Sequence, residues 1–145
     1  MKKFNTTGIC YPERHYMVDI TERLTRIKGM IDEGDYFCIN RGRQYGKTTT
    51  LHAIETSYKE ELTVLSMSFE GKGEETFSKV ESVYADFVFQ IWMMVEFEVL
   101  TDLSDEIKTL ISEAYAKADG SNALSEKDFC LFVRKLCLKH SKPVV

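Results

Sequence analysis

The sequence predicts an α/β fold in which a parallel sheet is flanked by helices. Two short apolar segments, Tyr36–Asn40 and Leu62–Phe69, have the composition of core strands, and helical patterns lie between and after them. Strands that alternate with helices usually pair in parallel, because the helix returns the chain to the same end of the sheet. The chain has 145 residues, and residues 1–145 are expected to form one domain.

The expected helices have periodic apolar patterns and recognisable ends. Apolar residues at helical spacing predict a first helix that starts at Asp19 or Thr21 and ends at Glu33, with Gly34 as its stop. A second helix is expected to start at Lys47 and to end at about Tyr58.

The C-terminal half is predicted to be rich in helices. A long helix or a broken pair is expected over Thr76–Leu100, followed by a helix that begins at Ser104 and ends near Asp119. Ser125 and Asp128 resemble a capping box, in which a hydroxyl and an acidic side chain three residues later satisfy free backbone groups. They predict the start of a last helix.

The segment from Arg41 to Thr50, with the sequence RGRQYGKTTT, is the main functional signal. It follows one expected strand and leads into one expected helix, which is the layout of a phosphate-binding P-loop. The usual pattern has a glycine where this chain has Arg41, and Gly42 follows one place late. An ordinary strand-to-helix turn is the alternative.

The residue types suit the chemistry of a bound nucleoside triphosphate. Backbone N–H groups of the loop and the positive end of the helix would surround a phosphate, and Gly46 would let the backbone approach closely. Lys47 would reach the β- and γ-phosphates, and the Thr48 hydroxyl would bind Mg²⁺. The cofactors expected are therefore ATP and Mg²⁺, bound by Arg43, Gln44, Tyr45, Gly46, Lys47, Thr48 and Thr49.

The run FCINRGRQYGKTTTLHAIE, from Phe37 to Glu55, resembles the bacterial AAA-ATPase-like proteins, a P-loop NTPase family. The segments Lys2–Leu24 and Leu65–Gly71 are similar to the same family. The resemblance implies that arginine is the usual residue at position 41. It also implies a longer protein in which a C-terminal effector domain, often restriction-endonuclease-like, follows the ATPase domain.

The resemblance implies a second hydrolysis motif, in which a strand ends in Asp-Glu and holds the Mg²⁺ shell. Lys142–Val145 is expected to begin that strand, so the chain ends before the acidic residues. Glu70, at the end of the second expected strand, is expected to be peripheral to metal binding. ATP binding is therefore expected and hydrolysis is doubtful, with no catalytic residue named. The alternative is a non-catalytic fragment or assembly module with a vestigial phosphate loop.

Residues before the first expected strand offer a weaker signal. By resemblance, His15, Tyr16 and Asp19 could contact the base or ribose of a nucleotide. Simple packing of this leading segment is the preferred interpretation.

The composition limits the partners and the compartment. The net charge is −4, and no nucleic-acid-reading module is recognisable, so nucleic-acid binding is not supported. The most hydrophobic region is Phe87–Leu100, and its longest uninterrupted apolar run, Ile91–Val95, is too short to span a membrane. No signal peptide is expected after Met1. The four cysteines have no zinc or redox spacing and are expected to be buried free thiols, which favours the cytoplasm.

Self-association is also expected. Two strands alone form a marginal sheet, and the Phe87–Leu100 region is rich in large apolar residues. A homo-oligomer would cover them.

Overall fold

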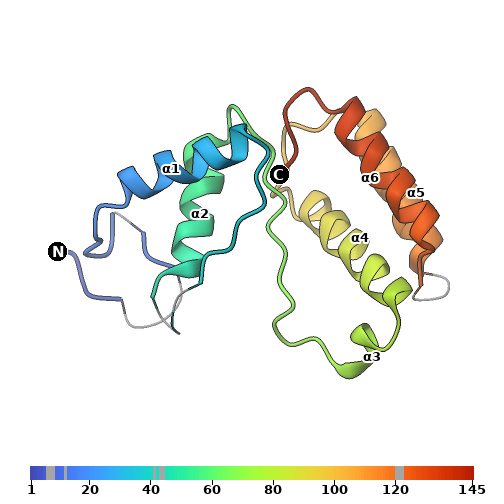
Figure 1. Ribbon diagram of the computed structural model, residues 1–145, viewed down its shortest axis with the longest axis horizontal. Coiled ribbons are helices and arrows are strands. Elements are labelled where there is room, and N and C mark those ends of the chain that lie inside the picture. Colours follow the sequence, from blue (N-terminus) through green and yellow to red (C-terminus); the bar gives the residue numbers. More distant parts are fainter. Residues whose placement is uncertain (6–8, 12, 41, 43–44, 120–122) are drawn as a thin grey trace. The chain divides into compact units, whose positions relative to one another are not determined.

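The computed structural model describes residues 1–5, 9–11, 13–40, 42, 45–119 and 123–145. These residues form two compact units, one made of Met1–Val64 with Val145 and one of Leu65–Val144. Six helices are present in the described part of the chain (Figure 1). They are α1 (Thr21–Asp32), α2 (Lys47–Tyr58), α3 (Glu74–Phe77), α4 (Val80–Glu96), α5 (Asp105–Asp119) and α6 (Glu126–Lys139).

The prediction of a parallel α/β sheet is wrong. The segments Tyr36–Asn40 and Leu62–Phe69 are not strands, and the described residues contain no sheet. A parallel bridge between Lys3 and His15 lies outside any strand. The P-loop NTPase fold expected from the sequence is therefore corrected to a helical architecture in the part of the chain that is described.

The physical reason is that a strand needs a partner, whereas an apolar composition is a local property. Tyr36 is fully exposed, and the backbone of Tyr36–Asn40 forms no hydrogen bond with other described residues. In the second segment, the Ser68 N–H donates to the side chain of Gln90 at 2.8 Å instead of to a neighbouring strand.

The first unit is built around α1 and α2, which pack against each other. Ile27 of α1 and Ile54 of α2 are buried, so each helix covers an apolar residue without a sheet. Gly34 ends α1 as predicted: its φ is 74°, its N–H donates to Ile31, and the Asp35 N–H donates to Met30. These two bonds form a Schellman motif.

The second unit is centred on α4, which packs against α3, α5 and α6 (Figure 1). Val88, Ile107 and Ile111 are almost completely buried between these helices. Trp92 stacks on Tyr115 with ring centroids 4.2 Å apart. Much of the apolar surface that was expected to drive self-association is thus covered within one chain.

Two smaller expectations have different outcomes. The cysteines are free, but Cys38, Cys130 and Cys137 are exposed, so the expectation of buried thiols is wrong for these three. The expected absence of a membrane span has support, because no helix in the described ranges combines the length and the apolar character that crossing a bilayer requires.

The start of α6 has the predicted cap. The Ser125 hydroxyl accepts a hydrogen bond from the Asp128 N–H at 3.2 Å and donates to the Asp128 carboxylate at 2.6 Å. Lys117 lies 2.6 Å from the same carboxylate. The hydrogen bond from Lys117, and to a smaller extent the hydrogen bond from Ser125, hold the pKa of Asp128 below its usual range.

We predict that Ser125→Ala lowers the free energy of unfolding by about 1 kcal/mol, because the α6 N–H groups lose their cap. Ser112 is an exposed serine inside α5, so Ser112→Ala is the matched control and should leave stability unchanged or slightly higher. Chemical denaturation followed by circular dichroism measures both. Equal effects of the two substitutions would contradict the assigned cap.

Candidate phosphate site

The turn at Gly46 places the candidate phosphate site at the first residues of α2. Gly46 is the N-cap residue, with φ of 75° and ψ of 24°, which is the left-handed region. Residues with a Cβ rarely adopt this conformation, whereas glycine does so freely. Glycine also has no side chain that could cap the helix, and α2 has no side-chain cap. Among the described residues, no side chain therefore occupies the N-terminal end of the helix as an acceptor.

Thr50 holds the Gly46 carbonyl in place. Its N–H and its hydroxyl both donate to the Gly46 oxygen, at 2.8 and 2.9 Å. Thr50 is only 2% exposed, so this pair of bonds is protected from water. Thr50 was not named among the expected site residues. The available signal was a threonine four residues after the glycine, a spacing at which its hydroxyl reaches back to the glycine carbonyl.

Lys47 folds back over the loop that precedes the helix. Its Nζ donates to the Gly42 carbonyl at 3.0 Å, five residues earlier in the chain. The Tyr45 N–H also points to this carbonyl, at 3.4 Å. A Cβ at Gly42 would lie 3.1 Å from the ring of Tyr45, which is exposed and would have to shift slightly to accept it. The ammonium group is thus held beside the loop although the residue is exposed.

The two threonines that follow Lys47 have different surroundings. Thr48 is exposed, and its N–H has no partner among the described residues, nor has that of Thr49. The Thr49 hydroxyl accepts a hydrogen bond from the Cys10 N–H at 3.3 Å, which attaches the N-terminal segment to α2. Thr48 is therefore the hydroxyl available to a ligand, and Thr49 has a structural contact.

These features together suit an anion. The first N–H groups of a helix have no carbonyl acceptor in the helix, and the helix dipole makes this end positive. Tyr45, Gly46, Lys47, Thr48 and Thr49, all expected at the site, lie together here. Arg41, Arg43 and Gln44 lie outside the described residues.

The residues suggested for a base or ribose contact have local partners in the structure. The Tyr11 N–H donates to Nδ1 of His15 at 2.9 Å, and Tyr16 packs on Phe4 with ring centroids 5.0 Å apart. Hydrogen bonds from the hydroxyl and N–H of Thr21 hold the pKa of Asp19 below its usual range. These contacts are local to the leading segment and the start of α1.

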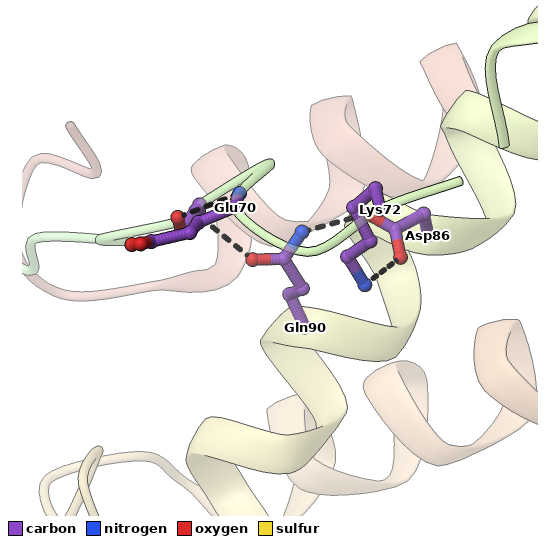
Figure 2. A network of polar contacts seen from close by, with 5 residues as sticks. Glu70, Lys72, Asp86 and Gln90 are labelled. Carbon is purple, nitrogen blue, oxygen red and sulfur yellow. Dashed lines mark hydrogen bonds and ion pairs between the residues drawn. The ribbon is translucent and has the colours of Figure 1, made fainter. Parts of the chain in front are cut away.

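Glu70 belongs to the second unit, where a polar network fixes the segment around it (Figure 2). The Glu70 N–H donates to the Ser68 hydroxyl at 3.1 Å, while the Glu70 carboxylate points away from Lys72 and Asp86. Across the described ranges, no three His, Cys, Asp or Glu side chains come together in a group that could hold a metal ion.

Comparison with known proteins returned no similarity. No protein-family model, no curated protein and no solved structure matches this chain.

We predict opposite effects for alanine at two glycines. Gly46→Ala should lower the free energy of unfolding by about 1 kcal/mol, because alanine is strained in the left-handed region. Gly29 lies inside α1, and a Cβ there meets nothing within 4 Å. Gly29→Ala should therefore raise stability by about 0.5–1 kcal/mol. Thermal or chemical denaturation of each variant tests this, and stabilisation by Gly46→Ala would refute the left-handed turn.

Proposed function

We propose that this chain binds a nucleoside triphosphate, ATP with Mg²⁺, at the start of α2. The observation that carries the proposal is the left-handed Gly46 directly before Lys47, with the Lys47 ammonium group folded onto the loop at Gly42. This geometry brings a cation and an uncapped helix end to one place. Each of the two attracts a phosphate group.

A bound phosphate would replace the Gly42 carbonyl as the acceptor for the Lys47 ammonium group. In the structure Lys47 Nζ donates to the neutral carbonyl of Gly42. A phosphate oxygen is a charged acceptor, and charge-assisted hydrogen bonds are about twice as strong as neutral ones. The N–H groups at the start of α2 would bind the same phosphate, and the Thr48 hydroxyl would be the protein's ligand to Mg²⁺.

The proposal is for binding, with hydrolysis doubtful. Among the described residues, the Thr48 hydroxyl is the ligand proposed for Mg²⁺, and no cluster of carboxylates is present to add to it. Much of the rate of phosphoryl transfer comes from positioning the metal and the attacking water. The resemblance to bacterial AAA-ATPase-like proteins supports the choice of nucleotide. It is also the basis for proposing an effector domain in a longer chain, whereas a cytoplasmic location is proposed from the four cysteines, which have no zinc or redox spacing.

The second candidate is an assembly module with a vestigial phosphate loop. The observation in its favour is the set of large apolar residues that remain exposed in the second unit. Phe97 and Val99 after α4, and Leu138 in α6, each have more than two thirds of their surface exposed. A second copy of the chain would cover such surface in a homo-oligomer.

We predict that Lys47→Ala weakens the binding of Mg²⁺-ATP by about 10-fold or more, because a charged hydrogen bond contributes about 1.5–3 kcal/mol. Isothermal titration calorimetry with Mg²⁺-ATP and the purified chain measures the change. Lys59→Ala is the matched control, since Lys59 follows the other end of the same helix. A 12-residue helix is about 18 Å long, which puts Lys59 beyond reach of the phosphates.

Three outcomes are informative. Loss of affinity in Lys47→Ala with wild-type affinity in Lys59→Ala would support the phosphate site. Equal losses would indicate general electrostatic attraction and would contradict it. No binding by the wild-type chain, together with a concentration-dependent mass in sedimentation, would favour the assembly module.

A further inference from the structure

The second unit contains a cavity that the proposed nucleotide site does not use. Its volume is about 380 Å³, which lies in the range of small-molecule pockets. Three helices contribute its walls. The residues that carry the argument are Glu75 and Thr76 of α3, Asp86 and Phe89 of α4, and Tyr115 of α5.

The charge of the cavity is negative. Asp86 is mostly buried and is paired with Lys72, and its second oxygen accepts from Gln90 Nε2 at 2.7 Å (Figure 2). Glu75 makes no ion pair within the described part of the chain. Lys72 therefore balances the Asp86 carboxylate. Glu75 is an exposed residue of the cavity wall, and no cation among the described residues balances its charge.

Lys72, which does not line the cavity, shows how two of the wall residues contact an ammonium group. Lys72 Nζ contacts the Asp86 carboxylate and also lies over the Phe89 ring, 5.7 Å from its centroid. The Tyr115 ring is 6.0 Å from that of Phe89. A carboxylate beside aromatic rings is the combination that recognises organic cations, through charge and through the electron-rich ring face.

We propose that this cavity binds a small organic cation, namely a primary ammonium group attached to a compact apolar or aromatic body. The ammonium group pairs with Glu75, and the apolar body lies against Phe89 and Tyr115. The Glu75 carboxylate disfavours anionic ligands, since Lys72 already balances the charge of Asp86. A neutral ligand of the same shape lacks the charge that Glu75 attracts.

The test uses 2-phenylethylammonium as the probe and 2-phenylethanol as its neutral counterpart. Trp92 is the only tryptophan in the chain and stacks on Tyr115, so its fluorescence reports on the cavity. Calorimetry provides an independent affinity. The full 145-residue chain should bind the cation at least about 5-fold more tightly than the alcohol, and rising salt should reduce this difference.

Two variants locate the cation, and one serves as a control. Glu75→Gln should weaken binding of 2-phenylethylammonium about 5-fold or more while leaving 2-phenylethanol unaffected. Glu74→Gln removes the same charge from the neighbouring residue, which does not line the cavity, and should have no effect. Phe89→Leu should weaken cation binding by about 2- to 5-fold, because the ring face is lost while the apolar character remains.

The outcomes separate the proposal from simpler explanations. Equal affinity for the cation and the alcohol would overturn it, since the cavity would then be only an apolar hollow. Equal losses in Glu75→Gln and Glu74→Gln would also overturn it, because they would indicate attraction by overall charge. Absence of binding by the well-folded wild-type chain would do the same. Lys47→Ala should bind the probe normally, so failure of the nucleotide site leaves this result unaffected.

Discussion

The left-handed turn at Gly46 is the constraint on which the first unit and its candidate site depend. It changes the direction of the chain so that Lys47 begins α2 directly after a glycine, which has no side chain to cap the helix. Thr50 keeps the turn in place from the buried side through two bonds to the Gly46 carbonyl. One glycine conformation thus determines where the Lys47 ammonium group, the Thr48 hydroxyl and the positive end of the helix lie.

The second unit depends on a different interaction, the packing of α4 with α5 and α6. Val88, Ile107 and Ile111 fill the space between these helices, and the Trp92 and Tyr115 rings stack at its side. Burial of this kind contributes about 25 cal/mol per Å² of apolar surface. A sheet is therefore not required to cover the apolar face of α4. The same packing forms two walls of the cavity that contains Asp86 and Tyr115.

Local signals in the sequence predicted local structure well. The bounds of α2, the glycine stop at Gly34 and the Ser125 cap were all predicted, because each is decided by residues a few positions apart. The strands were predicted wrongly, since pairing depends on distant segments that composition does not reveal. Thr50 was missed because its role appears only when its hydroxyl meets the Gly46 carbonyl. The cavity around Glu75 was missed because three separate helices create it.

Nuclear magnetic resonance of the backbone amides, recorded during addition of Mg²⁺-ATP, tests the central claim most directly. The predicted result is that the largest shifts fall on the amides of Gly42 and Tyr45–Thr49, with saturation at a single affinity. The amides of α5 and α6 should stay unchanged and serve as the internal reference. Shifts confined to residues outside this loop, or no shifts at concentrations that saturate ordinary nucleotide sites, would contradict a phosphate site at the start of α2.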